Sequence, residues 1–152
     1  MNILLDTNII LYIAKTGDFS KITRFVNPDE SLVYVSIASE AELRSFAIRN
    51  KWGIKRVAYL NSFLDLCNIM EVDQLLVNTY AEIDSYSQRL NPDFVNYAFD
   101  TPRNMGKNDL WIASLAALLN LKLVTTDGDF DHLHTVFFEV RKINPTEFTP
   151  YF

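Results

Sequence analysis

The sequence predicts an α/β protein, a three-layer α/β/α sandwich around a mainly parallel central sheet of about five strands. Short apolar runs rich in β-forming residues alternate along the chain with longer segments that have helical spacing. Parallel strands need crossover segments that return across a face of the sheet, so this alternation favours layers of helices on the sheet. No Gly/Ser-rich linker or internal repeat divides the 152 residues. We therefore expect one domain spanning residues 1–152.

The individual elements follow from the same patterns. The expected strands are residues 2–5, 32–37, 68–72, 121–125 and 136–140. The expected helices are residues 39–50, 54–66, 73–90 and 108–120. In open parallel sheets, ligands bind outside the carboxyl ends of the strands. The residues that follow these strands are therefore the first place to look for function.

Cysteine usage and hydropathy indicate a protein of a reducing, aqueous compartment. Cys67 is the single cysteine, and no Cys/His spacing matches a zinc site. The opening MNILLDTNIILYIAK has no basic segment before its apolar residues and is interrupted by Asp6, so we do not expect a signal peptide. The longest apolar run, residues 110–121, is shorter than the roughly 20 residues of a membrane helix. We expect a cytoplasmic protein without membrane contact.

The formal net charge of −5 argues against a nucleic-acid partner, because phosphate binding normally requires an excess of Lys and Arg. That argument fails if several acids are gathered to hold divalent cations. Bound cations reverse the local charge, and the net charge of the chain then misleads.

Four acids are candidates for such a site. Asp6 directly follows the first strand, Asp127 follows the fourth, and Asp109 opens the last helix. Glu42 lies about one and a half turns into the helix after the second strand. Each has an ordinary alternative: a helix cap for Asp6, a favourable first-turn charge for Asp109, an Asp-Gly turn for Asp127 and a solvated side chain for Glu42.

The joint placement of these acids is more informative than any one of them. Carboxylates gathered at one edge of a parallel sheet repel one another unless protons or cations compensate them. Oxygen-only ligands favour hard ions such as Mg²⁺ or Mn²⁺. The pattern therefore points to a carboxylate metal site. Asp129 and Asp131 follow Asp127 closely, and one of them is a candidate for a further ligand or for a helix-capping acid.

Four segments together resemble the PIN-domain family, and within it the VapC-type toxins of toxin–antitoxin pairs. They are LLDTNIIL, VSIASEAEL, GKNDLWIASLA and LVTTDGDFDHL, and their order and spacing match the family over essentially the whole chain. The resemblance maps the family's four acids onto Asp6, Glu42, Asp109 and Asp127. The small polar positions that support those acids in the family map onto Thr7, Asn8, Ser36 and Thr126.

The resemblance implies a PIN-like fold and an Mg²⁺- or Mn²⁺-dependent endoribonuclease that cuts RNA, with transfer or ribosomal RNA as expected targets. In this chemistry one or two metal ions activate the attacking water and neutralise the phosphate. It also implies a homodimer and a cognate antitoxin that holds the enzyme inactive.

Basic and aromatic residues are candidates for RNA contacts. Arg103 and Lys107 flank Asp109, and Arg44 belongs to a basic group along the second and third expected helices that also holds Arg49, Lys51, Lys55 and Arg56. A solvated helix face is an equally good explanation for that group. The aromatic candidates for base stacking or interface packing are Tyr12, Trp52, Phe94, Tyr97 and Phe99.

Rival functions remain open at this point. A metal-free ribonuclease would use His132 and His134, which we expect to be structural or surface residues. A haloacid-dehalogenase-type phosphatase expects Asp where this chain has Asn8, and this mismatch, together with the Glu42 segment, argues against it. A PIN-like interaction module without turnover and a DNA-directed nuclease are the alternatives that keep the same fold.

Overall fold

Five parallel strands form one sheet in the computed structural model, which describes residues 1–152. The strands are β1 (Ile3–Leu5), β2 (Val33–Ser36), β3 (Asn68–Met70), β4 (Lys122–Thr125) and β5 (Val140–Lys142). Their order across the sheet is β3-β2-β1-β4-β5, and every neighbouring pair is parallel. The predicted α/β class and the number of strands are confirmed.

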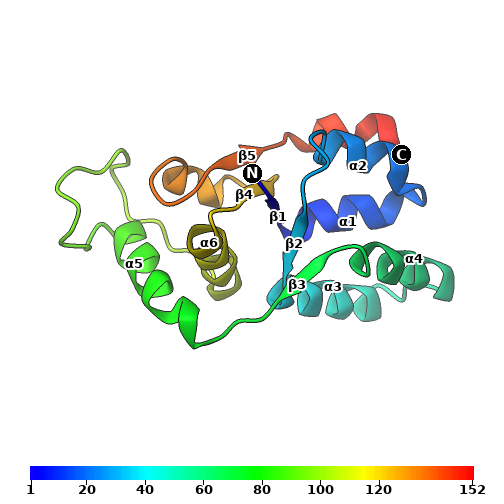
Figure 1. The fold of residues 1–152 in the computed structure, drawn as a ribbon, viewed down its shortest axis with the longest axis horizontal. Helices are drawn as coiled ribbons and strands as arrows, with labels where there is room; N and C mark the ends of the chain where they lie inside the picture. The colour runs from blue at the N-terminus through cyan, green and yellow to red at the C-terminus, as the bar shows by residue number, and fades with distance from the viewer.

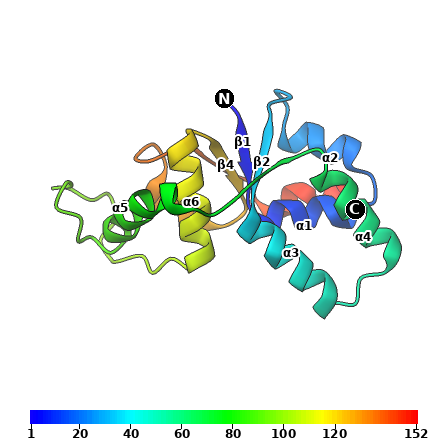
Figure 2. The ribbon, with the colours of Figure 1, turned by 60° about the horizontal axis from the view of Figure 1, so that its bottom comes forward.

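Helices cover both faces of this sheet (Figures 1 and 2). They are α1 (Thr7–Thr16), α2 (Phe19–Val26), α3 (Ile37–Arg49), α4 (Ile54–Leu64), α5 (Val77–Ser87) and α6 (Lys107–Leu119). Three short 3₁₀ segments complete the fold: η1 (Gln74–Leu76), η2 (Gly128–Leu133) and η3 (Pro145–Tyr151). None of the helices has the length and apolar character needed to cross a membrane.

The central strand β1 shows how the core divides into two clusters. Successive side chains of a strand point to opposite faces. Ile3 and Leu5 therefore join a cluster with residues of α1 to α4 and η3, while Leu4 joins a second cluster with residues of α5, α6 and η2. Both figures show these two groups of helices on either side of the strands. The three-layer sandwich predicted from the sequence is confirmed.

Two strands turn directly into helices, and a polar side chain caps each junction. Asp6 follows β1 in an extended conformation, and its carboxylate accepts a hydrogen bond from the Thr7 N–H at the start of α1. Ser36 ends β2, and its hydroxyl accepts one from the Ala38 N–H in the first turn of α3. These caps satisfy N–H groups that a helix start leaves unpaired. They also fix α1 and α3 at the carboxyl edge of the sheet.

The fifth strand lies later in the chain than predicted. The apolar run at residues 136–140 suggested a strand, but β5 is Val140–Lys142. Phe137 and Phe138 instead belong to a tight loop and pack against the second core cluster. The run is apolar because its side chains are buried, and buried side chains do not require a strand.

Arg141 is accommodated in β5 because this is an edge strand. Its guanidinium donates hydrogen bonds to the carbonyls of Phe25 and Val26 at the end of α2.

Further differences concern helices. Helices α1 and α2 were not predicted, although their residues lie between the first two expected strands. The expected helix 73–90 is divided into η1 and the shorter α5, and residues 88–106 contain no helix or strand. This long segment is anchored by aromatic side chains, because Phe94, Tyr97 and Phe99 pack around Tyr86 of α5.

The carboxyl-terminal segment is expected to contribute strongly to stability through Phe148. This side chain is fully buried and stacks on Tyr12, with ring centroids 4.4 Å apart. Replacing a buried Phe by Ala usually costs about 3–5 kcal/mol. Phe148→Ala should therefore lower the free energy of unfolding by that amount in urea titrations. Phe152→Ala, which removes a largely exposed ring, is the control and should change it by less than about 1 kcal/mol; equal losses in both variants would contradict this assignment.

Candidate functional site

The sheet brings the predicted acids to one edge. β1 and β4 are paired neighbours, so Asp6 at the end of one and Asp127 just beyond the end of the other leave the sheet on the same side. Asp109 comes from the first turn of α6, and Glu42 comes from α3, the helix that continues from β2. The four acids thus arrive from four separate parts of the chain.

Asp6 is the buried member of the group, with 4% of its surface exposed. One carboxylate oxygen accepts a hydrogen bond of 2.8 Å from the Thr7 N–H, and the other accepts one of 2.7 Å from the Thr125 hydroxyl. Burial raises the pKa of Asp6, whereas these two hydrogen bonds oppose that rise. The carboxylate is therefore held in a fixed orientation at the junction of β1, β4 and α1.

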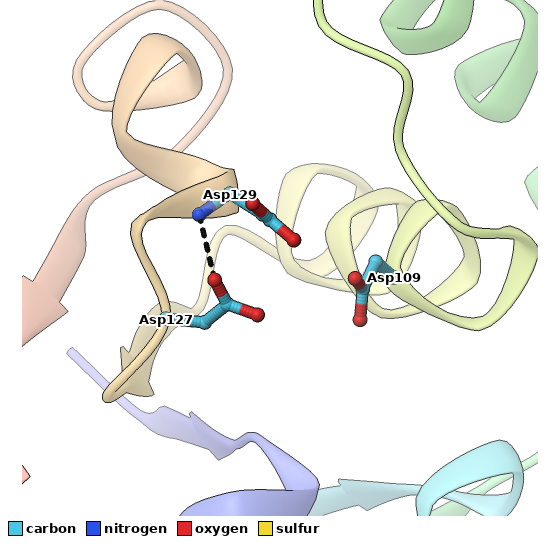
Figure 3. Close-up of side chains that lie close together, drawn as sticks. All are labelled: Asp109, Asp127 and Asp129. Atoms are coloured by element: carbon cyan, nitrogen blue, oxygen red, sulfur yellow. Dashed lines mark hydrogen bonds between the residues drawn. The ribbon is translucent and has the colours of Figure 1, made fainter.

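Three aspartates form the tightest group. Asp109, Asp127 and Asp129 each offer a carboxylate oxygen, and these oxygens lie within 4.8 Å of one another. Figure 3 shows the three side chains directed toward a shared space, with Asp109 across from the other two. The Asp129 N–H donates to one oxygen of Asp127 at 2.9 Å, and this hydrogen bond fixes the turn that leads into η2.

Glu42 faces Asp109 from the opposite helix. The Asn108 side-chain amide donates a hydrogen bond of 3.0 Å to the Glu42 carboxylate, which links α6 to α3. Both acids line an open cavity of about 450 Å³ together with Gly106, Lys107 and Asn108. The sequence carries no signal for this contact, because Asn108 and Glu42 lie 66 positions apart in the chain.

Mutual repulsion is visible in the proton affinity of Asp109. Burial, followed by the charges of Asp6 and Asp127, raises the pKa of Asp109 to about 7. Burial and the charge of Asp127 also raise the pKa of Asp129. A group of acids that binds protons more tightly than free carboxylates is under electrostatic stress, and a bound cation relieves the same stress.

The donor set fits a hard divalent cation. It consists of carboxylate oxygens from Asp109, Asp127 and Asp129, with Asp6 and Glu42 beside them. No thiol takes part, and Cys67 lies elsewhere, against the first core cluster. Such oxygen ligands suit Mg²⁺ or Mn²⁺ better than a soft metal ion.

The small polar residues take different positions around this site. The Thr7 hydroxyl bonds to that of Ser39 in α3, Asn8 is exposed, and Ser36 caps α3. The predicted support from Thr126 is supplied by its neighbour Thr125, which holds Asp6 and also accepts the Asp127 N–H at 3.0 Å. Thr125 is the last residue of β4 and is fully buried, whereas Thr126 lies beyond the strand and is only partly buried.

The three basic candidates are not equivalent. Lys107 lines the cavity of Glu42 and Asp109. The charge of Arg103 partly opposes the rise in the pKa of Asp129. Arg44 instead pairs with Glu40 at 3.1 Å and donates to Asn61. Residues two apart on a helix point in different directions, so Arg44 is directed away from Glu42 and lines a different cavity.

Neither histidine belongs to the acidic group. Nε2 of His132 is 2.7 Å from the Ser87 hydroxyl, and the ring packs against Phe99. Burial lowers the pKa of His132 to about 4, so the ring is neutral at pH 7. His134 is exposed and accepts a hydrogen bond from the Val140 N–H. Both residues have structural contacts, and the geometry provides no histidine pair for catalysis.

Comparison with solved structures finds the same architecture in toxin–antitoxin complexes. The chain matches VapBC2 of Rickettsia felis, solved with a promoter DNA fragment, at a TM-score of 0.71 and 21% identity, over 93% of this chain and 98% of that one. It matches DNA-bound VapBC of Salmonella typhimurium at 0.69 and 18%, with the same coverages of 93% and 98%. VapBC-5 of Mycobacterium tuberculosis, from the VapBC family of toxin–antitoxin systems, matches at 0.64 and 23%, again over 93% and 98%.

No curated protein matches the sequence. The comparison with family models is more direct, because the model described as "PIN domain" matches residues 3–135. That match includes β1 to β4 and every acid of the group at the sheet edge. The chain therefore belongs to the PIN-domain family.

Proposed function

We propose that this protein is a metal-dependent endoribonuclease that hydrolyses RNA phosphodiester bonds, with transfer or ribosomal RNA as its target. The observation that carries the proposal is the convergence of Asp109, Asp127 and Asp129 within 4.8 Å, beside Asp6 and Glu42, in a PIN-family chain. Carboxylates at this spacing are arranged to hold divalent cations. RNA is proposed over DNA because of the resemblance of the four acid-bearing segments to VapC-type toxins.

A bound Mg²⁺ or Mn²⁺ ion supplies a more acidic water as nucleophile and neutralises charge on the phosphoryl oxygens. Asp109, Asp127 and Asp129 are the residues that would hold it. Asp6 is set at a fixed position by Thr125, and Glu42 is oriented by Asn108 from across the cavity. Lys107 lies at the cavity mouth, where its ammonium group can pair with a substrate phosphate.

The partner proposed for this enzyme is a cognate antitoxin, and the proposed assembly includes a homodimer of the chain. Support for the antitoxin comes from the fold match with three VapBC structures, each covering 93% of this chain. The homodimer is proposed from the resemblance of the four acid-bearing segments to VapC-type toxins. An interaction module without turnover and a DNA-directed nuclease share this fold, and cleavage assays separate them from the proposed enzyme.

The purified protein is expected to cut total RNA into discrete products only when Mg²⁺ or Mn²⁺ is present. Asp6→Asn and Asp109→Asn should each lower the rate by at least about 100-fold, because each removes a charge from the metal site. Asp65→Asn, a change of the same kind at the exposed end of α4, is the control and should cut at the parent rate. Cleavage of matched DNA but not RNA would favour the DNA-directed alternative. Metal binding without any cleavage would favour the interaction module.

Thr125→Val tests the orientation of Asp6 without changing charge or volume. The substitution removes the hydroxyl that donates to Asp6 and accepts from Asp127. Loss of such a supporting hydrogen bond typically weakens metal binding or activity about 10- to 100-fold. Calorimetric titration with Mn²⁺ should show this loss in Thr125→Val, whereas Thr126→Val should bind like the parent protein. Equal affinities for Mn²⁺ in the two variants would show that the Thr125 hydroxyl does not support the metal site.

The raised pKa of Asp109 predicts how metal-free stability depends on pH. Its pKa is about 7 in the folded protein, against an ordinary value of 3.8. The folded state therefore binds this proton more tightly, so the stabilising contribution present below pH 4 is lost as the pH rises through 7. In EDTA, Asp109→Asn should raise the melting temperature by a few degrees at pH 8 and by less at pH 5.5. The same difference at both pH values would show that Asp109 titrates normally.

A further inference from the structure

Positive charge gathers on the side of the molecule formed by α1, α3 and α4, and most of it has no acidic partner. Residues 43–64 contain five Lys and Arg residues and no Asp or Glu, in a chain with 19 acids and 14 bases. They are Arg44, Arg49, Lys51, Lys55 and Arg56. Helix α1 adds Lys15 in its last turn and carries no acid of its own. The structure holds two ion pairs, Arg44–Glu40 and Lys142–Asp131, so the other cations of this group have no carboxylate partner.

Two aromatic rings lie among these cations. The Phe46 ring has the Lys15 ammonium 5.7 Å and the Arg49 guanidinium 5.8 Å from its centroid. Trp52 meets Phe46 edge-on at 5.9 Å, and the Arg56 guanidinium lies 5.4 Å from the Trp52 ring. All three cations are exposed, whereas both rings are partly buried. Cations at the solvent side of fixed aromatic rings are typical of surfaces that bind single-stranded nucleic acid.

A groove connects this surface to the acidic site. A cavity of about 460 Å³ is lined at one end by Thr7, Asn8 and Glu42, and its lining also includes Phe46 and Arg49. A second cavity of about 390 Å³ is lined by Lys15, Lys55 and Arg56. The Lys15 ammonium, which lines the second cavity, lies 5.7 Å from the centroid of the Phe46 ring, which lines the first. We call the two together the α1/α3 groove.

We propose that the α1/α3 groove binds the single-stranded RNA next to the cleavage point, with a base on Phe46 and phosphates on Lys15 and Arg49. This inference rests on the proposed ribonuclease function. A strand with one phosphate at the acids must continue across the neighbouring surface. The groove there is lined by Glu42 of the acidic site and also by Phe46, Arg49 and Lys15. A base on the ring displaces the two cations toward the adjacent phosphates. The negative net charge of the chain is thereby reconciled with an RNA substrate.

The test measures binding of a fluorescein-labelled twelve-nucleotide single-stranded RNA by anisotropy, with Mg²⁺ present and over a range of salt. All proteins carry Asp109→Asn so that the probe is not cut. Lys15→Gln/Arg49→Gln should weaken binding and reduce the slope of log K against log salt by about 1.4, since each phosphate contact contributes about 0.7. Phe46→Leu should weaken binding at least about fivefold with the slope unchanged, and Phe46→Tyr should restore it.

The matched control is Lys21→Gln/Arg24→Gln, the same change of charge on exposed residues of α2. This control should keep both the affinity and the slope.

If the groove variants bind RNA like the control while the unmutated enzyme cleaves RNA, the groove assignment is overturned and the proposed function stands. If the parent neither binds nor cleaves RNA, both fail. If the groove variants lose affinity for a hexaglutamate peptide but not for RNA, the groove belongs to an acidic protein partner and the RNA assignment is wrong.

Discussion

The buried carboxylate of Asp6 is the constraint around which the site is built. It lies where β1, β4 and α1 meet, and both of its oxygens are hydrogen-bonded, one to the Thr7 N–H and one to the Thr125 hydroxyl. An unpaired charge in this position would cost several kcal/mol. The hydrogen bond from Thr125 therefore ties the register of β4 to the start of α1. Because Thr125 also accepts the Asp127 N–H, the same hydroxyl positions the next acid of the site.

The more exposed acids of the site are not neutralised by neighbouring side chains. No ion pair neutralises the three clustered aspartates, Asp109, Asp127 and Asp129. The nearby cations are Lys107, which lines the same cavity as Asp109, and Arg103, whose charge acts on Asp129. Clustered like charges destabilise a fold, so stability alone does not explain three unpaired acids in one place. The acids are supported by the backbone instead: Asp109 lies in the first turn of α6, and Asp127 begins η2 by accepting the Asp129 N–H. The local structure thus tolerates negative charge that a cation is suited to neutralise.

Residues that follow buried strands were predictable from the sequence, whereas contacts between elements were not. Asp6 and Asp127 come directly after apolar runs, so the rule that sites lie at the carboxyl ends of parallel strands identifies their edge. The choice between Thr125 and Thr126 depends on where β4 ends, and an apolar run of four residues does not fix that end. The contact between Asn108 and Glu42 depends on how α6 packs near α3. The edge strand β5 was misplaced because Arg141 and Lys142 are polar, and the polar side chains of an edge strand leave no hydrophobic signal.

The strand order has a consequence for the timing of assembly. β1 begins at residue 3, yet one of its two neighbours in the sheet is β4, with Ile3 in register with Lys122. Such a long sequence separation makes the central pairing a late event, since local contacts form before distant ones. Synthesis runs from the amino to the carboxyl end, so Asp6 is made before Thr125, Asp127 and Asp129 and has none of them beside it until they follow. Before those residues follow, the chain carries separated acids, and the group formed by Asp109, Asp127 and Asp129 does not yet exist.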